Sequence, residues 1–509
     1  MTDLHNALYW FLSRTNQITW RAKQFYASCF LQVFRRNGLV ALVHQLHPEP
    51  VYVSERTWAD IPKKVITGTP SGKMDDLVQE LISRKVFISN PNTDLQELNN
   101  ARKRTLQMIN RPTILYLMMA QGCNFACNYC PIPDLAKQYG EHLLSFEDAI
   151  AGIKLWRKHI EEQPQDNSPY FLIFYGGEPL LNREVLEKLL PHIAKEKNAG
   201  HLPAKLELML CTNGSLVDAE LSKLLARYKV VVAIGIDGPQ KHNDLVRTTT
   251  SGSSTFTRIE HSVRQLVSDG VRVVASVTIT PANVNEIDQY PRFLQKLGFS
   301  QFGFNLMKGK VLVQQLAGQS MENYCRAAVR GVLQGLEDIT AEGQCYEYQL
   351  EKKLVAVRNG LPFSVDCTCY GNQLVIQADG QVSNCPFLRF DQGQVRELPD
   401  SFRIRQTKAV ETWRRRLPIL NASVKVDGHK DIFSGGGCAR SSFDLYGDIE
   451  AEDTANTIFT KEITHELIWT LLPGEQANAI RQEKTTHWSY RRVRNLSVTG
   501  TCDFRKRRN

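Results

Sequence analysis

Three cysteines lie close together in the run Cys123-Asn-Phe-Ala-Cys127-Asn-Tyr-Cys130. Three thiolates on one short loop can hold a 4Fe-4S cluster while leaving one iron without a protein ligand. An open iron binds a small molecule and passes it an electron, whereas a fourth cysteine closes the cluster and suits plain electron transfer. The alternatives are a chance group of buried thiols and a zinc knuckle, which needs a fourth Cys or His nearby.

A glycine-rich loop follows the next strand-like segment. Residues 171–175 are apolar and run directly into Gly176-Gly177-Glu178-Pro179. Two glycines let a backbone approach a ligand closely, and a carboxylate beside them accepts hydrogen bonds from an ammonium group. The tetrapeptide is also typical of an ordinary turn, so its meaning depends on its place after the cysteines.

Two further loops follow strand-like segments. Residues 206–211 lead into Thr212-Asn213-Gly214-Ser215, and residues 230–236 lead into Asp237-Gly238-Pro239. Parallel α/β folds place their chemistry at the carboxyl ends of strands, although both motifs are also plain turn formers. Cys211 lies in an apolar segment and is expected to be a core thiol.

The order and spacing of these motifs resemble those of the radical S-adenosylmethionine (SAM) enzymes. The signature of that family is the spacing of the three cysteines, with three residues and then two between them. The resemblance implies that Cys123, Cys127 and Cys130 hold a SAM-binding 4Fe-4S cluster. It accounts for the downstream loops, which neither a zinc knuckle nor a chance group of thiols explains.

The same resemblance implies roles for the loops around the cofactor, S-adenosyl-L-methionine. Gly176-Gly177-Glu178 is expected to hold the methionyl amino group, and Tyr129 is expected to pack near the adenine. An ordinary loop aromatic is the alternative for Tyr129. The other cofactor contacts that the resemblance implies are Thr212, Asn213, Asp237 and Arg247.

The stretch from Gly235 to Arg247 is similar to the Ser-x-Asp-Gly-Pro…His-Asp…Arg pattern of family members that modify peptides and proteins. Two positions depart from it, because Gly235 replaces the serine and Asn243 replaces the aspartate. The lost hydroxyl at 235 puts one cofactor contact in question, while Arg247 can still face a carboxylate.

Hydrophobic periodicity predicts an α/β fold with six β/α units between Pro112 and about residue 320. Ser145 and the residues after it form a capping-box-like helix start, followed by apolar residues on one helix face. Six units make a partial (β/α)6 TIM-type barrel that is open on one side, and the resemblance implies that the opening admits a long-chain substrate. The strands are expected to begin near Ile114, Phe171, Leu206, Val230, Val273 and Phe302.

A second group of cysteines lies further along the chain. Cys367 and Cys369 precede a strand-like segment at 373–378, and Cys385 follows the turn at Asp379-Gly380. Because Asp-Gly returns the chain in a hairpin, it brings the flanking cysteines together. This arrangement resembles the start of a cysteine-rich SPASM/twitch-like extension, which carries auxiliary iron–sulfur clusters.

Cys438, after Ser434-Gly-Gly-Gly, resembles the Gly-Gly-Cys of the same extension, but the usual closing run of cysteines is missing. The resemblance therefore implies one auxiliary 4Fe-4S cluster, held by Cys367, Cys369, Cys385 and Cys438. A zinc site made by the same thiols is the alternative, and Cys345 or Cys502 can replace Cys367 as a ligand.

Four segments follow from these assignments: an N-terminal α+β module at 1–110, the barrel at 111–320, linker helices with the auxiliary cluster domain at 321–450, and a C-terminal helix with a basic tail at 451–509. The first resembles modules that grip leader peptides, and a plain capping subdomain is its alternative. The tail from Arg481 carries +7 of the net charge of +9. A solvated end is expected there, and nucleic acid is not an expected partner.

Composition agrees with a large soluble enzyme of more than one domain. The chain has 509 residues, of which 42% are hydrophobic and 23% charged. Its 12 cysteines follow no signal peptide, which is typical of reduced thiols in the cytoplasm. No apolar run is long enough to span a membrane.

The sequence thus predicts a radical SAM peptide maturase. Such an enzyme reductively cleaves SAM to a 5′-deoxyadenosyl radical, which abstracts hydrogen from a residue of a ribosomally synthesised precursor peptide with a leader. Crosslinking, backbone excision and epimerisation remain open, and no catalytic acid or base is assigned. Expected partners are an electron donor such as flavodoxin or ferredoxin and a small leader-binding protein. The alternatives are an anaerobic sulfatase-maturating-type enzyme and a non-catalytic, metal-stapled peptide-binding protein.

Overall fold

The computed structural model describes residues 17–20, 23–61, 73–90, 92–163, 169–340, 346–347, 353, 356, 365–424, 432–472 and 474. They form two compact units, one drawn from 1–44, 50–91 and 469–509 and the other from 45–49 and 92–468. Cys345, Cys502 and the basic tail lie outside the described residues. No helix in the described part of the chain is long and apolar enough to cross a membrane.

The first unit contains short strands and helices. Its core is apolar and includes Val40, Leu42, Leu77 and Leu81, each 2% exposed or less. Helix α4 (Asn92–Ile109) falls within the predicted segment 1–110 but belongs to the second unit. The strands form two three-stranded sheets, β1–β2–β6 (Gln17–Trp20, Lys23–Ala27, Phe87–Ile88) and β3–β4–β5 (Leu31–Arg36, Leu39–His44, His47–Ser54), beside helices α2 (Glu55–Asp60) and α3 (Lys73–Ser83).

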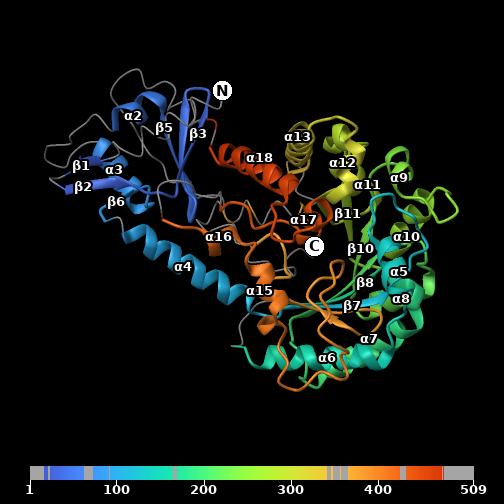
Figure 1. Ribbon diagram of the computed structural model, residues 1–509. Coiled ribbons are helices and arrows are strands. Elements are labelled where there is room, and N and C mark those ends of the chain that lie inside the picture. Colours follow the sequence, from blue (N-terminus) through green and yellow to red (C-terminus); the bar gives the residue numbers. More distant parts are fainter. Residues whose placement is uncertain are drawn as a thin grey trace. The chain divides into compact units, whose positions relative to one another are not determined.

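The second unit is built on a parallel sheet with the strand order that a (β/α)6 barrel requires (Figure 1). Each of the six predicted strands is present and starts within one residue of its expected position, which confirms the predicted fold class. The strands are β7 (Ile114–Ala120), β8 (Tyr170–Gly176), β9 (Leu206–Thr212), β10 (Val231–Gly235), β11 (Val273–Ile279) and β12 (Gln301–Leu306).

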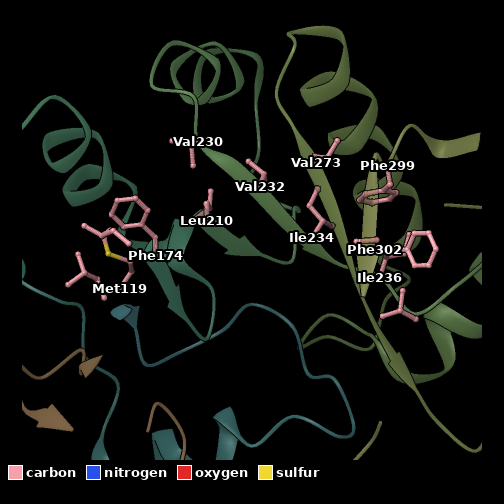
Figure 2. Close-up of a cluster of buried hydrophobic side chains, with 14 of the residues drawn as sticks. Met119, Phe174, Leu210, Val230, Val232, Ile234, Ile236, Val273, Phe299 and Phe302 are labelled. Carbon is pink, nitrogen blue, oxygen red and sulfur yellow. The ribbon is translucent and has the colours of Figure 1, made fainter. Parts of the chain in front are cut away.

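Alternate residues of the strands have different surroundings, because successive side chains point to opposite faces. Leu115, Leu172, Phe174 and Leu210 are fully buried in one core with the helices, and Figure 2 shows several such side chains on neighbouring strands. Side chains at alternate positions, such as Tyr116, Tyr175, Met209 and Cys211, are only half-buried. The inner face of the barrel therefore remains partly accessible, and Cys211, expected in the core, lies on this accessible face.

Helix α6 (Phe146–Glu161) begins as predicted, because the Ser145 hydroxyl accepts the N–H of Asp148 at 3.0 Å. The helices that follow the strands run along the outside of the sheet (Figure 1). The other helices are α4 (Asn92–Ile109), α5 (Ile132–Tyr139), α7 (Arg183–Asn198), α8 (Ala219–Arg227), α9 (Gln240–Val246), α10 (Phe256–Ser268), α11 (Tyr290–Leu297), α12 (Gly309–Leu316), α13 (Met321–Thr340), α15 (Lys408–Arg414), α16 (Pro418–Asn421), α17 (Ala439–Tyr446) and α18 (Thr454–Thr470), with short 3-10 helices at Pro179–Asn182, Val284–Gln289 and Ile404–Gln406.

The sheet continues beyond the six barrel strands. Strand β14 (Gln373–Ile376) pairs in parallel with β7, Gln373 opposite Ile114, and it also pairs with β15 (Val382–Ser383) in an antiparallel hairpin. The predicted turn at Asp379-Gly380 joins these two strands. A short β13 (Tyr346–Glu347) extends the other edge at β12. The cysteine-rich extension is therefore part of the barrel sheet.

His159 links α6 to the 3-10 helix at Ile404–Gln406. The N–H of Ile404 donates to Nε2 of His159 at 3.1 Å, so the proton must lie on Nδ1, which donates to the carbonyl of Leu155 at 2.8 Å. The His159 side chain is fully buried, and this burial is the main cause that lowers its pKa to about 4. The neutral imidazole is thus part of the packed structure.

This pKa makes stability depend on pH. The unfolded histidine takes up a proton near pH 6.5, so the stabilisation is complete above that pH and is lost as the pH falls toward 4. We expect His159 alone to lower the free energy of unfolding by about 3 kcal/mol over that range. The free energy of unfolding, measured by denaturant titration, should change less between pH 6.5 and pH 4 in His159→Gln than in the wild type. An equal dependence on pH in the two proteins would contradict this. The exposed His201 provides the control variant, His201→Gln.

Candidate functional site

The loop with Cys123, Cys127 and Cys130 follows β7 and is held by the main chain at the end of the Gly235–Arg247 stretch. The N–H of Ala126 donates to the carbonyl of Thr248 at 2.8 Å, and the N–H of Asn128 donates to the carbonyl of Val246 at 3.0 Å. These bonds involve only main-chain atoms. No residue type could therefore have revealed them in advance.

The Gly-Gly-Glu loop after β8 packs against the start of the cysteine loop. The N–H of Gly177 donates to the carbonyl of Ala120 at 2.8 Å, and that of Glu178 donates to the carbonyl of Gly122 at 3.0 Å. A Cβ on Gly177 would lie 2.1 Å from the oxygen of Gly122, and Gly176 has a φ of +133°. The glycines are therefore needed for contact between two loops.

The Glu178 carboxylate joins the ends of β8 and β9. It accepts hydrogen bonds from the hydroxyl of Thr212 at 2.7 Å, from the N–H of Asn213 at 2.8 Å and from the N–H of Leu180 at 3.0 Å. The residue is fully buried, and this burial raises its pKa in spite of the three donors. A cationic group bound beside it would offset that cost, because an opposite charge favours the ionised carboxylate.

Asn213 links this carboxylate to the cysteine loop. Its Nδ2 donates to Oδ1 of Asn124 at 2.8 Å and lies 3.8 Å from the sulfur of Cys123. Asn124 in turn donates to the hydroxyl of Ser215 at 2.9 Å. The structure thus joins the loops after β7 and β9, and Asn124 and Ser215 are members of the site that sequence reasoning missed.

Asp237, Arg247 and Tyr129 form a second group, in which the fully buried Asp237 lies beside the half-buried Arg247 and Tyr129. Nε of Arg247 donates to Oδ2 of Asp237 at 2.7 Å, and the Tyr129 hydroxyl donates to the same oxygen at 2.5 Å. The Arg247 guanidinium lies over the Tyr129 ring, 5.6 Å from its centre. Burial acts to lower the pKa of Arg247, but the attraction of Asp237 outweighs it and keeps this side chain charged.

The two departures from the expected pattern have physical explanations. A Cβ at Gly235 would lie 2.6 Å from Nη1 of Arg247, so the guanidinium occupies the space that a serine would need. Asn243 uses both halves of its amide, because Oδ1 accepts from the N–H of Asp237 at 3.2 Å and Nδ2 donates to Thr255 at 3.0 Å. An aspartate could not make that donation.

The three thiols of the cysteine loop are half-buried, and burial is the main cause that raises their pKa values. The pKa reaches about 12 for Cys123 and about 11 for Cys127. Binding of iron must therefore displace protons from these thiols. Their all-sulfur donor set fits an iron–sulfur cluster, in which different thiolates bind different irons. Within the described ranges, no three His, Cys, Asp or Glu side chains are arranged to hold a metal ion.

The structure brings the four auxiliary thiols together from three segments. The N–H of Cys369 donates to the sulfur of Cys367 at 3.4 Å. The neighbouring thiols of Cys367 and Cys385 raise the pKa of Cys369, and the interaction with Cys369 lowers the pKa of Cys367. Burial is the main cause that raises the pKa of Cys438, and the thiols of Cys367 and Cys385 add to it. An all-sulfur set of this kind again fits iron and sulfur. Cys325 is fully buried in α13.

The contact between Gly235 and Arg247 yields a double-mutant test. We expect Gly235→Ala to destabilise the protein by roughly 1–3 kcal/mol, because the added methyl displaces a packed side chain. Arg247→Ala removes the obstructing group, so adding Gly235→Ala to that variant should cost almost nothing. Chemical denaturation of the four proteins measures this coupling. Additive effects of the two substitutions would show that the contact does not exist.

Comparisons with known proteins agree with this geometry. Residues 117–294 match the radical SAM superfamily. The chain is 27% identical over 209 residues to the radical SAM cyclopropyl synthase TigE of Paramaledivibacter caminithermalis, which is 38% of this chain and 41% of that protein. It is 24% identical over 304 residues to the cysteine-type anaerobic sulfatase-maturating enzyme of Clostridium perfringens, which is 57% of this chain and 78% of that protein. The chain therefore spans less than half of the first relative.

A solved structure of native anSMEcpe with bound AdoMet has a similar fold. The TM-score is 0.57 at 19% identity, and the match covers 72% of this chain and 99% of that one. The cysteine loop and the loops after β8, β9 and β10 all lie in or beside the matched barrel. The chain therefore carries a domain at residues 117–294 that matches the radical SAM superfamily, and the candidate site lies in this domain.

Proposed function

We propose that this protein is a radical SAM peptide maturase that modifies a residue of a ribosomally synthesised precursor peptide. The observation that carries the proposal is the meeting of three thiols, a buried Glu178 and the Asp237–Arg247 pair at the carboxyl ends of neighbouring strands. Such an edge is where parallel α/β folds bind ligands and perform chemistry. The reducing environment that free thiols require supports a cytoplasmic location.

In this proposal, each group has a role toward the cofactors. Cys123, Cys127 and Cys130 hold the SAM-binding cluster, and Cys367, Cys369, Cys385 and Cys438 hold one auxiliary cluster. When bound, the first cluster supplies the electron that splits SAM into methionine and a 5′-deoxyadenosyl radical, which takes hydrogen from the substrate. The thiols must give up their protons on loading, so burial makes loading favour higher pH.

The SAM loops provide complementary charges. Glu178, with Thr212 and Asn213 as its donors, offers a buried negative group to the methionyl ammonium beside Gly176 and Gly177. Nε of Arg247 donates to Asp237, and among the described residues its two Nη groups donate to no protein atom. These groups are therefore available to a carboxylate. Tyr129 is half-buried beside them and provides a flat surface for the adenine.

A peptide substrate is supported by the relatives and by the partly accessible barrel interior. One solved structure of similar fold is native anSMEcpe with bound AdoMet and Cp18Cys peptide, at a TM-score of 0.54. More than a quarter of this chain has no counterpart in the anSMEcpe match, which covers 72% of it. We assign leader-peptide binding to the α+β unit at the N-terminus. A flavodoxin or ferredoxin donates electrons, and a small leader-binding protein assists.

A sulfatase-maturating-type activity is the second candidate. It is favoured by the match to the Clostridium perfringens enzyme, which extends over 78% of that protein. The two candidates differ in the substrate they accept. A short peptide encoded beside this gene should be modified under the first, and a sulfatase-derived peptide with a target cysteine or serine under the second. Mass spectrometry of both peptides after anaerobic incubation separates them.

The first experiment is anaerobic reconstitution followed by iron counting and an assay of 5′-deoxyadenosine. We expect about eight irons per wild-type chain, because the proposal gives it two four-iron clusters. Cys123→Ala/Cys127→Ala/Cys130→Ala should hold about four and lose all SAM cleavage. Cys367→Ala/Cys385→Ala/Cys438→Ala should also hold about four but should still cleave SAM.

Cys29→Ala is the control, because this thiol lies in the other unit, and it should leave both the iron count and the cleavage unchanged. Zinc in place of iron, or no deoxyadenosine from any preparation, would refute the enzymatic proposal. The remaining interpretation would be a non-catalytic peptide-binding protein in which the bound metal only stabilises the fold.

A further inference from the structure

Gln373 begins β14, and its side chain lies against the auxiliary thiols. Nε2 of Gln373 donates to the sulfur of Cys369 at 3.2 Å and to the main-chain oxygen of Asn384 at 2.6 Å. Its Oε1 accepts from the hydroxyl of Thr368. Gln373 is only 2% exposed, and its pairing with Ile114 anchors it to the barrel sheet. The amide is therefore fixed beside the sulfur.

The orientation of this amide follows from its neighbours. A main-chain carbonyl can only accept, so the atom that faces the oxygen of Asn384 must be the amide nitrogen. A flipped amide would set its own oxygen against that carbonyl and against the electron-rich sulfur of Cys369. The same nitrogen therefore presents an N–H group to the Cys369 sulfur.

A cation approaches the auxiliary thiols from the barrel side. Lys308 lies between β12 and α12, and the next residue, Gly309, donates its N–H to the hydroxyl of Ser441 at 3.3 Å. That hydroxyl donates to Oδ1 of Asp453 at 3.1 Å, and Oδ2 of Asp453 accepts the N–H of Cys438 at 2.8 Å. This chain of bonds places Lys308 beside the start of α17, where Cys438 lies.

Lys308 is exposed, and its ammonium group is positively charged at neutral pH. The main-chain contacts of the neighbouring Gly309 put this cationic residue on the side of the auxiliary thiols where Cys438 lies.

An iron–sulfur cluster gains negative charge when it is reduced. An N–H group pointing at a ligand sulfur and a nearby cation both stabilise that added charge, and hydrogen bonds to the sulfurs are known determinants of cluster potential. We propose that Gln373 raises the reduction potential of the auxiliary cluster through its bond to Cys369, and that Lys308 acts in the same direction. This inference rests on the auxiliary cluster of the proposed function. The auxiliary cluster is then easier to reduce than it would be without these two groups.

The test uses the full-length chain with Cys123→Ala/Cys127→Ala/Cys130→Ala, so that the auxiliary cluster gives the only iron signal. After anaerobic reconstitution, its midpoint potential is measured by redox titration followed by electron paramagnetic resonance. We expect Gln373→Leu to retain about four irons per chain. Its midpoint potential should become more negative by at least about 59 mV, which for one electron corresponds to a tenfold change in the redox equilibrium.

Gln377 is a matched control on the same hairpin. It is 1% exposed, and its Nε2 donates to the hydroxyl of Ser383 at 2.8 Å and to the carbonyl of Cys385 at 3.1 Å, with no bond to sulfur. Gln377→Leu should therefore leave the midpoint within the error of the titration. Equal shifts in the two glutamine variants, or an unchanged midpoint in Gln373→Leu with its iron retained, would overturn the proposal.

If Gln373→Leu loses its iron, Lys308 decides the question. Lys308→Met should move the midpoint to a more negative potential, and Lys308→Arg should keep it near the parent value because the positive charge remains. An unchanged midpoint in Lys308→Met would then overturn the proposal. A parent protein that binds zinc or no iron would also overturn it. SAM cleavage by the wild type would still test the proposed function separately.

Discussion

The pairing of β7 with a parallel strand on each side is the constraint on which the rest of the structure depends. Its carboxyl end leads into the cysteine loop, and its first residue, Ile114, pairs with Gln373, which touches Cys369. The strand has seven residues, so at about 3.3 Å per residue it separates the two thiol sites by roughly 20 Å. One strand thereby sets the distance between the two proposed clusters. Tyr116 lies on the accessible face between them. Burial is the main cause that raises its pKa, and the nearby thiols of Cys211 and Cys369 add to this effect.

Buried charge organises the cofactor end of the barrel. Glu178 and Asp237 are both fully buried, and each is surrounded by donors from loops on neighbouring strands. In a medium of low dielectric such hydrogen bonds are strong, and an unmade one is costly. The loops are therefore held in one arrangement before any ligand binds. Arg247 completes this arrangement, because it neutralises Asp237 and still presents further donors.

Main-chain contacts complete the site, and they explain why small residues are needed there. Gly177 brings its loop against the oxygen of Gly122, and Gly235 leaves room for the Arg247 guanidinium. A serine at 235 and this position of the arginine exclude one another. The departure from the family pattern is thus coupled to the position of Arg247 and is not an isolated loss of a hydroxyl. The absence of a side chain at position 235 and the position of the Arg247–Asp237 pair therefore depend on one another.

The sequence by itself determined the six barrel strands, the cap at Ser145 and the hairpin at Asp379-Gly380, because hydrophobic period and turn chemistry are local properties. It also indicated the cysteine and glycine loops, since their spacing is visible along the chain. Only the tertiary structure decided that β14 joins β7, that residues 246–250 hold the cysteine loop, and that Gln373 contacts the sulfur of Cys369. It also moved Cys211 from the expected core to the accessible face. These features depend on main-chain bonds and on contacts between residues far apart in sequence, and residue type and spacing do not encode either one locally.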